Sequence, residues 1–402
     1  MSFTSQPTTA ATSIGLPTLS FTLSVGVVKL RTRKEILSTP IQQLDLSKVK
    51  TVSDLVEQMK GASIQARNLG KCATVYENML MDSSRPTVIL GLSGALIAGG
   101  LRLVLRDMVA HGLVDCIVST GAVLYQDFYQ AMGYQHYKGD PWMDNLELRG
   151  HFIDRIYDTL VDEEKFREVD AYIGRITEQL DPRAYSTREF LSFMGEVAHK
   201  KGDRGILATC FEYGVPCFVP ALNDSSIGIG LTEYYEKHRN KPHFYLDPIR
   251  DNYELTQIKG KSKKTGVIYI GGGTPKNYIN DVEVIAEVLG YDVAGHEYAF
   301  QITTDRPDTG GLSGSTLEEA QSWGKIHREA TKATVWSEAT LALPLIVGHI
   351  LQKGLHRGRR RVRFEWEGDN LRAVKLVSGA NGAQVRAATT APRKRAAKTV
   401  AP

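Results

Sequence analysis

The feature of this sequence that most constrains its fold is a repeated alternation of apolar runs, small-residue turns and amphipathic helices. TVILGL, residues 87–92, is followed by SGALIAGG and then by LRLVLRDMVAHG, which has helical periodicity and ends at Gly112. VDCIVSTGA, VPCFVPALNDSS, GVIYIGGGTPK, HEYAFQITT and ATVW continue the alternation. Strands that alternate with helices favour a parallel sheet. We therefore predict an α/β fold with a Rossmann-like, doubly wound, mostly parallel sheet, helices on both faces and a helical insertion over residues 138–192.

The composition divides the chain into three parts. Residues 1–30 are rich in Ser, Thr and Pro, so we expect a flexible N-terminal arm. Residues 31–355 carry the alternating pattern and are expected to form one domain. Residues 356–402 contain the basic runs RGRRRVRF and RKRAAK and are expected to be a partly disordered extension that begins with a solvated edge strand. A nucleic-acid partner is not expected, because aromatic stacking residues are scarce there and the net charge is only +4.

Cysteine usage and hydropathy favour a cytoplasmic protein. Of the four cysteines, no two have CxxC spacing, and we expect buried free thiols, as in a reducing compartment. The N-terminus lacks the early Lys or Arg of a signal peptide, and no apolar run is long enough to span a bilayer, so we expect no membrane partner. No metal is expected, because no HExxH motif occurs and the ten histidines are scattered.

Polar or glycine-rich turns follow six of the predicted strands. Ligands of parallel α/β sheets bind at the carboxyl ends of the strands, and glycine lets the backbone approach a pyrophosphate. None of the turns fits GxGxxG, and each alone could serve packing, but three glycine turns in one chain favour dinucleotide binding. The turns are Ser93–Gly94, Thr120–Gly121, Asn223–Ser226, Gly271–Gly273, Thr303–Asp305 and Ser337–Glu338.

The loop TTDRPDTGGLSGSTLEEAQSWGKIHREA is the most informative stretch for chemistry. Ser315 or Thr316 is expected to cap a short helix that carries Glu319 and Trp323 on one face, with Lys325 just beyond it. A carboxylate, an indole and an amine together suit a cationic substrate that the amine attacks as an imine. A capped helix with a core Trp and a surface Lys is the alternative, and spacing alone favours it.

At this loop the chain resembles the deoxyhypusine synthase family. EEAQSWGKI matches the motif that holds the catalytic lysine of the family, and VPALNDSSIG, IYIGGGTPKNYI, STGA and ATVWSEATLALPLIVG match further motifs in the right order. The resemblance covers roughly residues 30–352, and LSG and YQDFYQAMGYQHYKG are closest to the bacterial and archaeal deoxyhypusine synthase-like branch. It implies an NAD-binding catalytic domain, a homotetramer built as a dimer of dimers, and active sites at dimer interfaces.

The resemblance also implies a chemistry and a set of residues. NAD takes a hydride from the carbon beside the secondary amine of spermidine, a lysine captures the aminobutyl group as an imine, and an acceptor amine then receives it. Lys325 corresponds to that lysine. The NAD-contact positions correspond to Ser93, Gly94, Thr120, Gly121, Asp224, Ser226, Thr304, Asp305, Glu338 and Ala339. The expected substrate-binding residues are Glu319, Trp323, Asn277, Asp281, Asp308 and Ser313.

Five positions depart from the pattern of the family. Gln126 stands at the place of a glutamate and Ile229 at the place of an aspartate that anchors a polyamine nitrogen. The others are Asn277 for a histidine, Asp281 for an asparagine and Gln301 for a tyrosine. A spermidine cation facing Ile229 would be desolvated without a paired charge, so a different amine such as putrescine or agmatine is expected.

Three functional hypotheses follow. The first is an NAD-dependent alkylamine transferase that acts through a Lys325 imine, with a small amine acceptor, giving homospermidine or a relative, or with a protein lysine as acceptor. The second is an NAD-binding module without turnover. The third is an unrelated dehydrogenase on the same fold, which would release NADH.

Overall fold

The computed structural model describes residues 31–311 and 313–378 and divides the chain into two compact units, Met1–Ile41 and Gln42–Pro402. The predicted N-terminal arm and the tail beyond residue 378 lie outside the described residues. In the first unit the described part holds the short helix α1 (Arg33–Ile36), capped by Thr32. All other elements belong to the second unit, which is described below.

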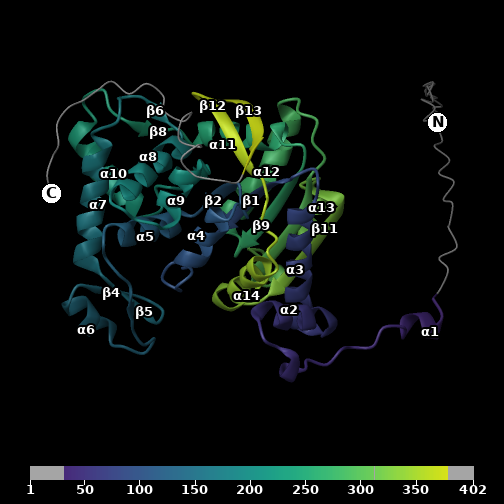
Figure 1. The fold of residues 1–402 in the computed structure, drawn as a ribbon. Helices are drawn as coiled ribbons and strands as arrows, with labels where there is room; N and C mark the ends of the chain where they lie inside the picture. The colour runs from purple at the N-terminus through teal and green to yellow at the C-terminus, as the bar shows by residue number, and fades with distance from the viewer. Residues whose placement is uncertain (1–30, 312, 379–402) are drawn as a thin grey trace, which may run out of the picture. The chain divides into compact units, whose positions relative to one another are not determined.

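The centre of the second unit is a six-stranded sheet in which every neighbouring pair is parallel (Figure 1). The prediction of a parallel α/β sheet is therefore confirmed. The strand order is β11-β10-β9-β1-β2-β7. The strands are β1 (Thr87–Leu92), β2 (Cys116–Ser119), β7 (Cys217–Phe218), β9 (Thr265–Ile270), β10 (His296–Thr303) and β11 (Ile326–Trp336).

Two apolar cores lie on opposite faces of this sheet. In β1, Leu90 belongs to a core shared with α3, α4, α5 and α14, whereas its neighbour Ile89 belongs to a core shared with α11, α12 and α13. Successive side chains of a strand point to opposite faces, so the fully buried run TVILGL supplies both cores. Helices thus flank the sheet on both sides, which leaves its strand ends free for a site.

Several helices begin at residues whose side chains cap them. Thr51 and Ser186 form capping boxes with Asp54 and Glu189, and Asp247 caps a helix that starts with Pro248. The helices of the second unit are α2 (Val52–Gly61), α3 (Ile64–Met81), α4 (Arg102–Ala110), α5 (Gly121–Ala131), α6 (Asn145–Gly150), α7 (Glu163–Thr177), α8 (Thr187–Lys200), α9 (Ile206–Tyr213), α10 (Ser226–His238), α11 (Pro248–Lys261), α12 (Gly273–Val288), α13 (Leu317–Ser322) and α14 (Ala339–Gln352), with 3-10 turns η1 (Leu46–Lys48) and η2 (Pro307–Thr309).

The insertion predicted to be helical is not purely helical. Besides α6 and α7 it contains an antiparallel sheet of β3 (Tyr137–Lys138), β5 (Thr159–Asp162) and β4 (Ile153–Ile156). Strands β4 and β5 are joined by Tyr157 and Asp158, and Tyr157 has a φ of 56°. A two-residue hairpin turn of this kind usually contains Asn or Gly, and their absence here concealed the hairpin in the sequence.

Two smaller sheets complete the unit. Strands β6 (Ala184–Tyr185) and β8 (Tyr245–Leu246) pair in parallel. Strands β12 (Arg361–Glu367) and β13 (Asn370–Val377) form an antiparallel hairpin, drawn in yellow in Figure 1, where only a single edge strand was expected. The guanidinium of Arg188 lies 4.1 Å from the ring centroid of Trp366, which fixes the hairpin to α8.

Candidate functional site

The carboxyl ends of the six parallel strands lie at one edge of the sheet, so all six predicted turns meet there. In sheet order they follow β11, β10, β9, β1, β2 and β7. Neighbouring turns are hydrogen-bonded to each other: the Ser93 hydroxyl accepts the N–H of Gly272 at 2.9 Å, and the N–H of Thr120 donates to Leu92 at 3.0 Å. This edge is the candidate site.

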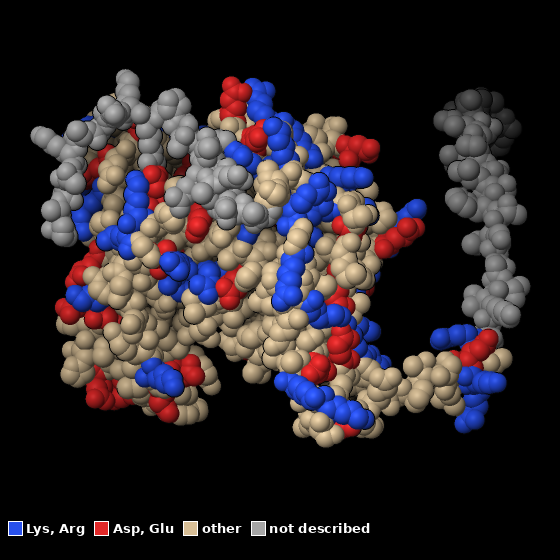
Figure 2. Space-filling model, in the orientation of Figure 1, with Lys and Arg blue, Asp and Glu red and all other residues tan. Residues whose placement is uncertain are grey.

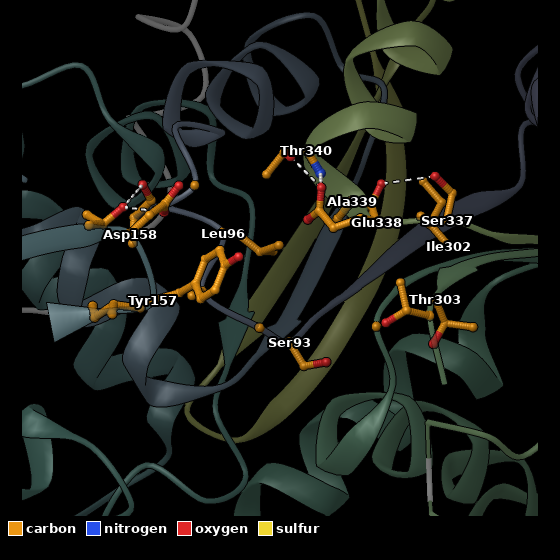
Figure 3. A pocket seen from close by; sticks show the side chains of 18 of the residues that line it. Ser93, Leu96, Tyr157, Asp158, Ile302, Thr303, Ser337, Glu338, Ala339 and Thr340 are labelled. Atoms are coloured by element: carbon orange, nitrogen blue, oxygen red, sulfur yellow. Dashed lines mark hydrogen bonds between the residues drawn. The ribbon is translucent and has the colours of Figure 1, made fainter. Parts of the chain in front are cut away.

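A cavity of about 890 Å³ lies at this edge, between the strand ends and the antiparallel insertion. Figure 3 shows Ser93, Thr303 and Glu338 around it, with Tyr157 of the insertion facing them. Among the predicted cofactor-binding residues, the following line the cavity: Ser93, Gly94, Thr304, Asp305, Glu338 and Ala339. Ser313, predicted to bind substrate, lines this cavity too. Its volume is in the range of sites that hold a drug-sized or cofactor-sized ligand.

Two glycines explain why the turn after β9 packs closely against its neighbours at this edge. Gly271 has a φ of 71°, and a Cβ there would lie 2.4 Å from the Ser93 hydroxyl oxygen. At Gly272 a Cβ would lie 2.3 Å from the Cα of Ser313. Only glycine fits both places, so the turn after β9 passes directly between the β1 turn and the loop after β10.

Four predicted cofactor residues do not line the large cavity but extend the same edge. Thr120 precedes α5, and Gly121 begins that helix. A Cβ on Gly121 would lie 2.4 Å from the Ser225 hydroxyl, so the β2 turn contacts the loop after β7 that holds Asp224 and Ser226. Asp224 is exposed and Ser226 half-buried.

Lys325 is positioned by the end of helix α13. Thr316 caps its start, where its hydroxyl accepts the N–H of Glu319 at 2.9 Å. At the other end of the helix, Gly324 has a φ of 72°. The N–H of Gly324 donates to the carbonyl of Gln321 at 3.1 Å, and the N–H of Lys325 donates to the carbonyl of Ala320 at 3.1 Å. These are the two bonds of a Schellman motif, which requires a left-handed residue, and here Gly324 supplies it. The SWGK sequence therefore ends α13 and fixes the backbone of Lys325 at the entrance to β11.

The amine of Lys325 is surrounded by an acid and an indole. Its Nζ lies 2.7 Å from Oδ1 of Asp281 and 5.5 Å from the ring centroid of Trp323. The other oxygen of Asp281 accepts the amide N–H of Asn277 at 2.9 Å. The Lys325 side chain is 16% exposed, whereas Trp323 is 67% exposed. The alternative hypothesis, a core tryptophan with a surface lysine, is therefore wrong for both residues. The amine of Lys325 is largely covered, and the ring of Trp323 is exposed.

A second cavity, of about 300 Å³, contains Lys325. It is also lined by the predicted substrate residues Asn277, Glu319 and Trp323, while Pro307, Gly310 and Gly311 come from the loop after β10. The same loop lines the large cavity through Thr304, Asp305 and Ser313, so one segment borders both.

Lys276 is the main residue of this cavity that sequence reasoning missed. Its Nζ donates to Oε1 of Gln301 at 3.1 Å and to the carbonyl of Ser315. Burial lowers the pKa of Lys276 to about 8, although the charges of Glu319 and Asp305 act to raise it. The signal in the sequence was a lysine within the first turn of the helix after GGGTP. The pocket therefore holds two amines.

Several remaining residues have structural contacts or lie outside the cavities. Gln126 is buried and its side-chain oxygen accepts the N–H of Ala98, in the loop that lines the large cavity, at 3.2 Å. Gln301 donates to the carbonyls of Gly271 and Ser313. Asp308 is exposed and pairs with Arg306 at 2.8 Å, and that hydrogen bond lowers its pKa. Ile229 is 60% exposed on α10.

Other features of the described residues bear on the predictions made from composition. All four cysteines are buried and free, as expected. No helix within residues 31–311 and 313–378 is long and apolar enough to cross a membrane. Glu57, Glu77 and His349 come together, but Lys60 and Lys353 both bind Glu77 within 2.9 Å, so this group is an ion-pair network. On the face shown in Figure 2, basic and acidic side chains are interspersed.

Comparisons with known proteins bear on the family of this chain. The deoxyhypusine synthase family model matches residues 54–350. Probable deoxyhypusine synthase 2 of Methanosarcina mazei is 43% identical over 82% of this chain and 95% of its own length. The deoxyhypusine synthase-like protein of Chlorobaculum tepidum is 44% identical, with 82% and 94% covered. The chain therefore belongs to the deoxyhypusine synthase family, in its bacterial and archaeal deoxyhypusine synthase-like branch.

A solved structure is similar at the level of the fold. A crystal structure of a candidate deoxyhypusine synthase from Entamoeba histolytica has a TM-score of 0.51 at 19% identity, covering 77% of this chain and 96% of that one. At this identity the likeness concerns the α/β architecture alone.

Proposed function

We propose that this protein is an NAD-dependent transferase that moves an aminobutyl-type alkylamine group to an amine acceptor through an imine on Lys325. The observation that carries the proposal is the placement of the Lys325 amine. The Lys325 side chain is 16% exposed, and its amine lies 5.5 Å from the ring centroid of Trp323. Lys325 lines the smaller cavity, and the loop after β10 borders both this cavity and the large cavity at the strand ends. A covered amine beside a cofactor-sized cavity suits capture of an oxidised substrate carbon.

The large cavity is where we propose that NAD binds, on a sheet wound in the Rossmann-like manner that the sequence predicts. Its walls fit a dinucleotide in two respects. Backbone at Gly94 and Gly271 is open to a pyrophosphate, and the carboxylate of Glu338 follows β11, where a ribose hydroxyl could be bound. NAD would take a hydride from the donor carbon next to nitrogen and would return it to the imine formed with the acceptor, so that no net NADH is released.

The residues of the smaller cavity have roles in this proposal that follow from their chemistry. Glu319 and the indole of Trp323 attract the cationic donor. Lys325 attacks the oxidised donor carbon and holds the alkylamine group until the acceptor arrives. Lys276, buried and with a pKa of about 8, places a second ionisable amine in the same cavity. The loop with Pro307, Gly310 and Gly311 lines the cavity beside these residues.

The donor is proposed to be a small amine other than spermidine in its usual pose. Ile229, at the place of a polyamine-anchoring aspartate, offers no charge to a cation. Putrescine or agmatine is small enough to fit a cavity of about 300 Å³ as the donor substrate. The product would then be homospermidine or a relative. A protein lysine is the other acceptor class, and a product analysis separates the two.

The proposal includes a homotetramer, a dimer of dimers, in the cytoplasm. Trp323 is 67% exposed and Ile229 is 60% exposed, although both belong to the predicted site. Large exposed apolar side chains at a site are typical of an interface, so a second copy of the chain is proposed to cover them. The free cysteines support a reducing compartment.

The experiment that tests this function is mass analysis of the products after incubation with NAD and mixed polyamines. A transferred alkylamine group without net NADH supports the transferase. Accumulation of NADH would instead indicate a dehydrogenase. The loss of a carboxylate at Ile229 favours one further candidate, a binding module without turnover, and calorimetry that detects NAD binding but no amine binding would identify it.

A further inference from the structure

Asp281 contacts Lys325 directly, although it was expected to bind substrate. Its Oδ1 lies 2.7 Å from the Lys325 Nζ, and its Oδ2 accepts the Asn277 side-chain N–H at 2.9 Å. Asn277 and Asp281 are four residues apart on α12, so they lie on one face of that helix. Because both carboxylate oxygens have partners, the rotamer of Asp281 is fixed toward the lysine.

The exposures of the two side chains differ in a way that suits proton movement. The Lys325 side chain is 16% exposed, but that of Asp281 is 41% exposed. Solvent therefore reaches the carboxylate more readily than the amine. An amine must be uncharged to attack carbon, so a covered lysine needs a group that removes its proton. Among the described residues, the carboxylate of Asp281 accepts a hydrogen bond from its Nζ.

We propose that Asp281 is the proton acceptor of Lys325 and holds its amine in place for attack, an inference that rests on the proposed function. Before attack the proton moves from Lys325 to Asp281, leaving a neutral amine and a neutral carboxylic acid. The amine then adds to the C=N carbon of the oxidised donor, and that carbon–nitrogen bond to the departing amine breaks. The departing amine takes the proton from Asp281, which restores the carboxylate, and the positive charge stays on the Lys325 imine.

An ordinary surface ion pair would behave differently. Such pairs between exposed side chains interact weakly, because water and salt screen both charges. The pair Lys375–Glu365 on the β12–β13 hairpin, at 2.8 Å with 58% and 33% exposed side chains, is a matched example away from the cavities. Glu365→Gln therefore serves as the control for removing one carboxylate from a lysine.

The first test measures the reactivity of Lys325 without turnover. The full-length protein and its Asp281→Asn and Glu365→Gln variants react with trinitrobenzenesulfonate over a range of pH, and peptide mass spectrometry reports labelling of Lys325. Because Asp281→Asn removes the proton acceptor that lies 2.7 Å from the Lys325 amine, labelling of Lys325 should be at least about tenfold slower in this variant than in the wild type. It should not be slower in Glu365→Gln. Equal labelling rates for Asp281→Asn and the wild type would overturn the inference.

The second test measures the rate at which borohydride traps the donor-derived adduct on Lys325. Loss of the proton acceptor should slow adduct formation at least about 100-fold in Asp281→Asn, and Asp281→Glu should recover part of it. Wild-type rates in Asp281→Asn would refute the role in proton transfer. If the wild type forms no adduct, the proposed function fails, whereas the labelling rates still decide whether Asp281 activates Lys325.

Discussion

Replacing Lys276 by methionine should change how the stability of the protein depends on pH. The Lys276 amine is buried and its pKa is about 8, against an ordinary value of 10.5. Between these values the unfolded chain binds the proton and the folded chain does not, so unfolding takes up a proton and stability rises with pH. A pKa difference of about 2.5, at 1.36 kcal/mol per unit, corresponds to about 3 kcal/mol gained between pH 8 and pH 10.5.

The assay is chemical denaturation of the wild type and Lys276→Met at a series of pH values from 7 to 10.5. The lost hydrogen bonds to Gln301 and Ser315 shift the free energy of unfolding by an amount that does not depend on pH. The wild type should therefore gain about 3 kcal/mol relative to Lys276→Met across this range. Lys375→Met, whose side chain is 58% exposed, removes a surface charge as the control. A constant difference between wild type and Lys276→Met would refute the burial argument.

Two further substitutions test the glycine turn after β9 and the role of Ile229. Gly272→Ala places a Cβ 2.3 Å from the Cα of Ser313 and should weaken NAD binding at least about tenfold. Gly150→Ala, which has open space around it, is the control and should leave NAD binding unchanged. Calorimetry with NAD compares the two variants, and equal affinities would contradict the close packing at Gly272. Ile229→Asp, at an exposed position on α10, should strengthen spermidine binding because it restores an anionic partner for the cation. If calorimetry shows an unchanged affinity for spermidine, Ile229 is not the residue that excludes it.

The carboxyl edge of the sheet was predictable from the sequence because each strand is a short apolar run that ends at a polar or glycine turn. Once the strands are parallel, these turns must meet, and the large cavity follows. The environment of Lys325 was only partly predictable. The spacing of Glu319 and Trp323 follows from the helix period, but the contact with Asp281 joins residues 44 positions apart, which no local pattern encodes.

Two features escaped sequence reasoning for different physical reasons. The β4–β5 hairpin turns at Tyr157 with a φ of 56°, a conformation that is costly for a residue with a Cβ and is therefore not expected from the sequence. In the sequence Lys276 is one more charged residue on an amphipathic helix, and only tertiary packing buries it. Burial of a lysine depends on which elements cover it, here β10 and the loop around Ser315.

The most direct test of the central claim is borohydride trapping in the presence of NAD and a donor amine, read by peptide mass spectrometry. Lys325→Arg keeps the positive charge but cannot form the imine, and Lys332→Arg makes the same change within β11. We expect a donor-derived adduct on residue 325 in the wild type and in Lys332→Arg, and none in Lys325→Arg. An equal amount of adduct in Lys325→Arg would contradict the account.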